Sequence, residues 1–96
     1  MEIIKKAQAG SFESSDILIL AEKPKDTKGR VIQLNSIVEK QYGEMILKTV
    51  SKVLDEFEVA DIHLVIHDKG ALTTVIQARM ETVLLRASNN QKGTMY

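Results

Sequence analysis

The stretch SIVEKQYGEMILKTVSKVLDEF, residues 36–57, contains the clearest helix signal in the chain. Its apolar residues recur at spacings of three and four, which places them on one face of a helix of roughly five turns. Ser36 and Glu39 have the spacing of a capping box, in which each side chain satisfies a backbone N–H of the other residue. Gly43 lies inside this helix and should cost about 1 kcal/mol relative to alanine. The predicted apolar stripe consists of Val38, Tyr42, Met45, Ile46, Val50, Val53, Leu54 and Phe57.

A strand and a second helix are expected after this segment. Residues 61–67 alternate between a strongly apolar face and a mixed face, which is typical of a strand with one buried side. Asp68 follows and is a candidate cap for the next helix. Residues 71–87 again show helical spacing of apolar side chains, which predicts a second amphipathic helix.

The N-terminal part of the chain predicts three strands. Residues 1–7 weakly resemble an edge strand, whereas the continuous apolar run 17–20 suits a strand buried on both faces. Residues 23–30 form a polar loop that contains the single proline, so residues 31–34 are interpreted as the hairpin partner of the apolar run.

The predicted element order β-β-β-α-β-α indicates an α+β fold. We expect a small, mostly antiparallel sheet with two amphipathic helices packed on one face. Ninety-six residues suffice for one domain, which we assign to residues 1–87. The polar residues 88–96 are expected to form a frayed C-terminal tail.

Composition excludes several classes of function. The chain has 13 basic and 13 acidic residues, and this balance argues against a nucleic-acid binder, which needs a concentrated basic surface. It has no cysteine, so disulfides, thiolate metal sites and a cysteine nucleophile are ruled out. No signal peptide is evident, and the apolar run at 17–21 is too short to cross a bilayer. We therefore expect a cytoplasmic protein without a membrane partner.

Two possible catalytic or metal sites are not supported by the sequence. His63 and His67 have the spacing of a helical metal pair, but on a strand they would lie roughly 13 Å apart. A triad can be written from Ser14, His67 and Asp68, yet the strained G-x-S-x-G elbow of serine hydrolases is absent. We predict no catalytic residue and no metal ligand.

Ser14 and Ser15 lie in a polar segment that follows Gly10 and is flanked by Glu13 and Asp16. A serine in an exposed loop can be esterified by another enzyme. The same residues are also those of an ordinary turn, which is the interpretation that composition alone favours.

Four segments together resemble the acyl carrier subunit, or gamma chain, of citrate lyase. The similarity covers roughly residues 3–87. The segments are AGxxESSD at residues 9–16, EKQYG at 39–43, DKGAL at 68–72, and IQAR at 76–79 leading to LRA at 85–87.

The resemblance implies a specific modification of Ser14. In that family the first serine of ESSD carries 2'-(5''-phosphoribosyl)-3'-dephospho-coenzyme A through a phosphodiester bond. The arm ends in a thiol that carries acetyl and citryl thioesters between the alpha and beta subunits while citrate is cleaved to oxaloacetate and acetate. The chain would be a non-catalytic carrier, with a prosthetic-group transferase and an acetylating ligase as further partners. Glu13, Ser15 and Asp16 are expected to be read by the transferase.

This sequence departs from the family pattern at two positions. Tyr42 stands where phenylalanine is usual, and Thr73 stands where aspartate commonly follows Gly-Ala-Leu. The alternative interpretation is a non-enzymatic interaction or regulatory domain of the same fold, in which Ser14 is never modified. The mass of the chain distinguishes the two interpretations.

Overall fold

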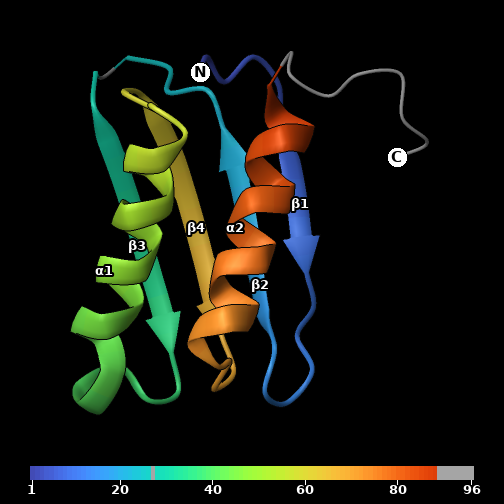
Figure 1. Cartoon of the computed structure of the whole chain (residues 1–96), viewed down its shortest axis with the longest axis vertical. Helices are drawn as coiled ribbons and strands as arrows, with labels where there is room; N and C mark the ends of the chain where they lie inside the picture. Colours follow the sequence, from blue (N-terminus) through green and yellow to red (C-terminus); the bar gives the residue numbers. More distant parts are fainter. Residues whose placement is uncertain (27, 89–96) are drawn as a thin grey trace.

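The computed structural model describes residues 1–26 and 28–88, and it contains four strands and two helices within them. Figure 1 shows both helices on the same face of the sheet, which confirms the predicted α+β architecture and element order. Apart from Ser88, the predicted tail lies outside the described residues. The elements are β1 (Ala7–Gly10), β2 (Ile17–Glu22), β3 (Arg30–Ser36), α1 (Glu39–Glu56), β4 (Ile62–Asp68) and α2 (Thr73–Ala87).

The sheet is mixed and has the strand order β1-β2-β4-β3. β2 pairs antiparallel with β1 and β4, as expected for a mostly antiparallel sheet, but β3 pairs parallel with β4. The predicted hairpin between β2 and β3 is therefore wrong, because β4 lies between them. The reason is that α1 crosses over from β3 to β4, and a crossover connection through a helix joins parallel neighbours.

The first strand is also displaced from its expected position. β1 begins at Ala7, whereas residues 1–7 were expected to form the strand. Ile3 contributes only an isolated bridge to Ser88, although its side chain is buried. The chain start therefore packs against the core through Ile3 without continuing the ladder of β1.

The core lies between the sheet and the two helices. The inner face of β4 is confirmed as apolar and buried, and the stripes of both predicted helices contribute to the same buried cluster. Tyr42 is an exception, because it lies at the exposed start of the α1 stripe and remains about half exposed, at 49 %. The fully buried side chains include Ile17, Ile19, Ile46, Val50, Leu54, Ile62, Leu64, Ile66, Ile76, Met80 and Leu84.

The helix starts differ from the two predicted caps. α1 begins at Glu39 after Val38, whose apolar side chain cannot cap it, so the capping box is not formed. Ser36 instead donates its hydroxyl to Asp68 Oδ2 at 2.8 Å and accepts the Val38 N–H at 3.1 Å. Ser36 and Asp68 are register partners on β3 and β4, so the carboxylate captures the hydroxyl that a capping box would need.

Asp68 does not cap α2 either, because the helix begins at Thr73 with Leu72 as its N-cap residue. The carboxylate of Asp68 accepts the N–H groups of Gly70 at 3.2 Å and Ala71 at 3.0 Å. Three donors thus satisfy an acid that is only 2 % exposed, as a buried carboxylate requires. Asp68 shapes the turn between β4 and α2.

One end of the molecule gathers five chain segments. The loop between β1 and β2 lies beside the C-terminal ends of β3 and β4 and the N-terminal ends of α1 and α2 (Figure 1). The chain start lies at the opposite end. No helix of residues 1–26 and 28–88 is long and apolar enough to cross a membrane.

Candidate functional site

Residues 11–16, here called the serine loop, connect β1 to β2. Within it Asp16 donates its backbone N–H to the carbonyl of Glu13 at 3.1 Å, which closes a four-residue turn. Ser15 has φ 64° and is the one turn residue in the left-handed region, as in a type II turn. Ser14 occupies the second position of this turn, where its side chain is exposed.

The hydroxyl of Ser14 is uncommitted. No hydrogen bond in the described part of the chain involves it, whereas the Ser11 hydroxyl donates to Asp16 Oδ2 at 2.6 Å. An exposed hydroxyl without a nearby base has little nucleophilicity of its own. Ser14 is therefore available as an acceptor of a group transferred by another enzyme.

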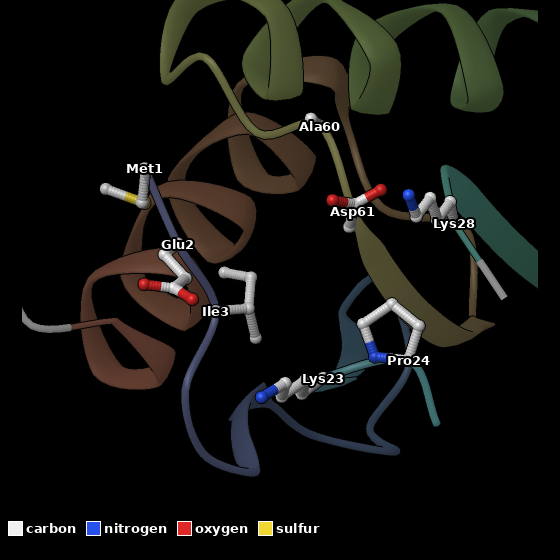
Figure 2. A pocket seen from close by; sticks show the side chains of 8 residues that line it. All are labelled: Met1, Glu2, Ile3, Lys23, Pro24, Lys28, Ala60 and Asp61. Atoms are coloured by element: carbon white, nitrogen blue, oxygen red, sulfur yellow. The ribbon is translucent and has the colours of Figure 1, made fainter. Parts of the chain in front are cut away.

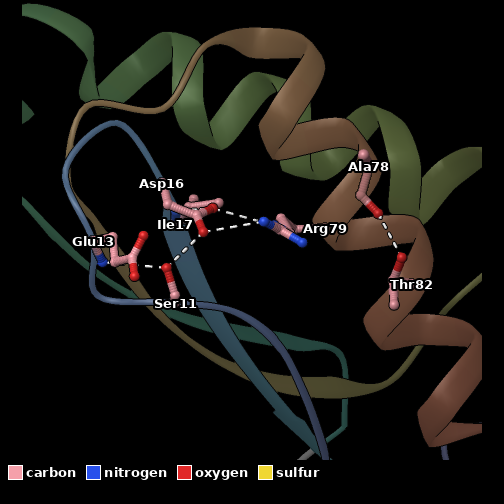
Figure 3. Close-up of polar contacts among 7 residues, drawn as sticks. All are labelled: Ser11, Glu13, Asp16, Ile17, Ala78, Arg79 and Thr82. Carbon is pink, nitrogen blue, oxygen red and sulfur yellow. Dashed lines mark hydrogen bonds and ion pairs between the residues drawn. The ribbon is translucent and has the colours of Figure 1, made fainter. Parts of the chain in front are cut away.

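Asp16 anchors the loop on the helix side of the sheet. Its carboxylate accepts hydrogen bonds from the Ser11 hydroxyl, from the Ile17 N–H at 2.7 Å, and from Nε and an Nη of Arg79 at 3.1 Å each (Figure 3). The Ser11 hydrogen bond above all, with those from Ile17 and Arg79, lowers the pKa of Asp16, although burial opposes them. The side chain is 15 % exposed, so it faces inward as a structural anchor.

The first residues of the loop are equally constrained. The Ser11 hydroxyl accepts the Glu13 N–H at 3.2 Å, so it bridges the start and the end of the loop. Gly10 has φ 93°, and a Cβ at this position would overlap the carbonyl oxygen of Ile17. Only glycine fits there.

The backbone of the loop is held by the end of β4. Ser15 donates its N–H to the Lys69 carbonyl at 2.8 Å, and Lys69 donates its N–H to the Asp16 carbonyl at 2.9 Å. Two loop residues therefore lie opposite one residue, which is the arrangement of a β-bulge. The bulge ends the β2–β4 ladder and turns Ser14 out of the sheet.

On the face of the sheet without helices, Phe12 holds the loop from the other side. Its ring centroid lies 5.4 Å from that of His67, with the two planes tilted by 54°. Phe12 is nevertheless 60 % exposed. The serine loop is thus held by Asp16 on one face and by Phe12 on the other.

The alternative sites considered from the sequence are not assembled. His67 and Asp68 are adjacent on β4, so their side chains point to opposite faces of the sheet. The Asp68 carboxylate also accepts the Ser36 hydroxyl. Ser14, His67 and Asp68 therefore do not form a catalytic triad. His63 Nδ1 lies 3.4 Å from Glu22 Oε1. Among residues 1–26 and 28–88 there is no group of three residues that could hold a metal ion.

A separate hollow of about 270 Å³ lies at the opposite end of the molecule (Figure 2). Lys23, Lys28 and Asp61 are among its lining residues, and Asp61 accepts the Gly29 N–H at 2.6 Å. Because this hollow is remote from Ser14, it is not part of the candidate site.

Arg79 supports the serine loop through Asp16, and the sequence reasoning gave it no role in the site. It belongs to the IQAR segment of the resemblance and is separated from Asp16 by 63 positions. Charge alone did not single it out, because α2 also carries Glu81 and Arg86. Its partner could not be known without the packing of α2 on β2.

Both comparisons of sequence find acyl carrier proteins. A family model described as ACP, malonate decarboxylase delta subunit (MdcD), matches residues 4–87. The citrate lyase acyl carrier protein of Yersinia enterocolitica is 43 % identical over 91 residues, covering 95 % of this chain and 93 % of that protein. The protein of the same name from Haemophilus ducreyi is 47 % identical over 89 residues, covering 93 % and 90 %.

A solved structure shares the fold. It is a chain of the Pseudomonas malonate decarboxylase hetero-tetramer in complex with malonate, with a TM-score of 0.66 and 20 % identity. The match covers 88 % of this chain and 84 % of that one.

Proposed function

This chain belongs to the family of citrate lyase acyl carrier proteins, and from that premise we propose that it carries a covalent cofactor arm on Ser14. Its role is that of a carrier subunit, not of a catalyst. The proposed arm is 2'-(5''-phosphoribosyl)-3'-dephospho-coenzyme A, joined to the serine oxygen by a phosphodiester bond. The proposed complex is a citrate lyase that cleaves citrate to oxaloacetate and acetate.

The exposure of Ser14 is the observation that supports this assignment best. Of the serines in the described residues, only Ser14 and Ser15 are exposed. Ser15 is held by its backbone to Lys69 at a positive φ, whereas no hydrogen bond in residues 1–26 and 28–88 involves Ser14. A bulky phosphodiester on Ser14 can therefore extend into solvent without breaking a hydrogen bond of the loop.

The rigid loop suits a carrier. When bound, the arm supplies a terminal thiol for acyl groups, and the protein holds the point of attachment. Tethering raises the local concentration of the thiol at each active site that the arm can reach. The serine loop is fixed by the hydrogen bonds of Asp16, Ser11 and the Lys69 backbone. The distance that the terminal thiol can cover therefore depends on the length of the arm and not on movement of the loop.

We propose different roles for the residues that flank Ser14. Glu13 and Ser15 are exposed and are the candidates for contact with the prosthetic-group transferase. The Asp16 carboxylate faces Arg79 and Ser11, so we assign it to positioning of the loop. The further partners in this proposal are the alpha and beta subunits and an acetylating ligase. A cytoplasmic location accords with a chain that has no cysteine.

A malonate decarboxylase carrier is the second candidate, because the family model bears that description. The relatives named for citrate lyase are 41–47 % identical, against 20 % for the malonate decarboxylase chain. This difference favours citrate lyase. Complementation of each enzyme lacking its own carrier would separate the two candidates.

The attachment is tested by co-expression with a citrate lyase prosthetic-group transferase and the cofactor precursor. Intact mass and peptide mapping should show the mass of the arm on Ser14 in the wild type, and no gain in Ser14→Ala. Any gain in Ser15→Ala should again map to Ser14, at a lower yield if the transferase contacts Ser15. Ser14→Ala should change the free energy of unfolding by no more than about 0.5 kcal/mol, because the side chain is exposed and unbonded. An unmodified wild type, with the transferase shown active on a known carrier, would instead support an interaction domain without a cofactor.

A further inference from the structure

A cleft of about 310 Å³ adjoins the serine loop. We call it the loop cleft and define it by Phe12 of the loop, Asn35 and Ile37 at the end of β3, and His67 and Lys69 at the end of β4. Its volume falls at the lower end of the range of roughly 300–1,000 Å³ that is usual for small-molecule sites. Phe12 and His67 line the cleft together, with their ring centroids 5.4 Å apart.

The lining of the loop cleft suits a nucleoside that carries a phosphate. An exposed aromatic ring such as Phe12 offers a face on which a base can stack, and the tilted His67 ring bounds the same space. The Asn35 amide can both donate to and accept from the edge of a base, while the Lys69 ammonium can pair with a phosphate. Glu39 and Asp68 also line the cleft. The Asp68 carboxylate already accepts hydrogen bonds from Ser36, Gly70 and Ala71, so a phosphate is expected at the Lys69 ammonium and away from Glu39.

We propose that the loop cleft holds the adenosine part of the arm attached to Ser14. This inference rests on the proposed function. In the arm, a phosphate and one ribose separate the serine oxygen from the adenosine, so the base emerges close to the turn. Phe12 lies two residues before Ser14, and Lys69 is hydrogen-bonded to Ser15. The position of Ser14 relative to the loop cleft is therefore fixed by the serine loop and the end of β4.

A neighbouring groove is a poorer match for a base. It lies between the starts of α1 and α2, has a volume of about 340 Å³, and is lined largely by apolar side chains such as Tyr42, Met45 and Leu72. A base placed there would find few partners for its polar edge, which carries a cost. Leu72 is 70 % exposed and provides a control position at the same end of the molecule.

Because the adenosine is tethered to Ser14, the loop cleft can be occupied even if its intrinsic affinity for adenosine is weak. A short flexible link gives an effective concentration of about 1 mM, so a cleft with a dissociation constant of about 1 mM would hold the adenosine about half of the time. Loss of base stacking weakens such binding roughly tenfold. Occupancy would then fall to about one tenth, a change that is readily measured.

The test uses isotopically labelled chain, first shown by mass to carry the arm on Ser14. Loading should shift the resonances of the Phe12 ring, the His67 ring and the Asn35 side-chain amide, and should give contacts between adenine protons and the Phe12 ring in NOE spectra. In Phe12→Leu the occupancy should fall about fivefold, from half to a tenth. Leu72→Ala, which lies outside the cleft, should leave the shifts unchanged.

Three results would overturn the proposal. They are shifts confined to residues 13–15 in the loaded chain, adenine contacts with the groove at Leu72, and cleft shifts that arise only when a partner subunit is added. A chain that gains no mass on Ser14 would contradict the proposed function itself, so the two failures are distinguishable. Because the Phe12 side chain is 60 % exposed, its replacement should leave the amide spectrum of the core unchanged.

Discussion

The carboxylate of Asp16 and the guanidinium of Arg79 face each other in a two-point contact, with both nitrogen–oxygen separations at 3.1 Å. The contact joins the serine loop to α2 across 63 positions of sequence. Forked pairs of this kind restrict orientation as well as distance. The placement of Ser14 therefore depends on how α2 packs on the sheet, although no residue of α2 belongs to the loop.

A double-mutant cycle measures this contact. Asp16→Asn and Arg79→Gln should each lower the free energy of unfolding, with a coupling energy of about 1 kcal/mol, since Arg79 is partly exposed and screened by solvent. Urea denaturation of the four proteins gives the coupling. The Lys6–Glu22 pair is the control, because Lys6 is 82 % exposed and the charges are 3.8 Å apart, and its coupling should be within error of zero. Additive effects of Asp16 and Arg79 would show that the contact does not stabilise the fold.

Lowering the pH should remove the contribution of Asp16 to the free energy of unfolding. Hydrogen bonds from Ser11 and Ile17 and the nearby Arg79 hold the pKa of Asp16 below its ordinary value. An acid with a lowered pKa stabilises the fold above the pKa of the unfolded chain, about 3.9, and this stability is lost as the pH falls through the lower pKa of the folded state. Urea midpoints between pH 7 and pH 2.5 should therefore begin to converge for wild type and Asp16→Asn below about pH 4, and should meet only below the pKa of the folded state. A difference that is constant with pH would contradict the assignment.

Ser15 is expected to be suboptimal for its turn. Its φ of 64° is one that glycine adopts without strain, whereas an L side chain there costs about 1 kcal/mol. Ser15→Gly should raise the free energy of unfolding by up to about 1 kcal/mol, and Ser15→Val should lower it, because a branched side chain tolerates this region least. Thermal denaturation of both variants checks the order. If Ser15→Gly loaded normally while Ser15→Val did not, turn geometry would be shown to matter to the transferase.

Periodicity was sufficient to predict α1, α2 and β4, because each buries one regular face. It could not predict the strand order, since the apolar run of β2 indicates that the strand is central but not which strands flank it. The prediction of a capping box was wrong for a related reason. Ser36 has a local partner in Glu39, but the register of β3 and β4 brings it to Asp68, and the buried carboxylate takes its hydroxyl.

The exposed turn of the candidate site could be predicted from the sequence, but the contacts that hold this turn in place could not. A polar segment after Gly10 predicts an accessible turn, and Ser14 is exposed in such a turn. The inward direction of the Asp16 side chain depends on Arg79 and the loop cleft depends on His67, and both lie more than fifty positions away. Such contacts are properties of the packed layers, so a single sequence does not reveal them.

Two glycines with opposite roles provide a matched pair of substitutions. Gly10 has φ 93°, and a Cβ there would overlap the Ile17 carbonyl oxygen, so Gly10→Ala must distort the junction of β1 and the serine loop. We expect a loss of about 3 kcal/mol or more in the free energy of unfolding. Gly43 lies inside α1, and a Cβ there meets the Cγ atom of Glu39 at 3.2 Å.

The Glu39 side chain is exposed and flexible at the first residue of α1, so it can move by the few tenths of an ångström that Gly43→Ala requires. The variant should then gain about 0.5–1 kcal/mol from the better helix propensity of alanine. Urea denaturation at neutral pH measures both variants against the wild type. A destabilised Gly43→Ala would mean that the close approach of α1 to its surroundings requires glycine, and a neutral Gly10→Ala would mean that the serine loop can adopt a second conformation without loss of the fold.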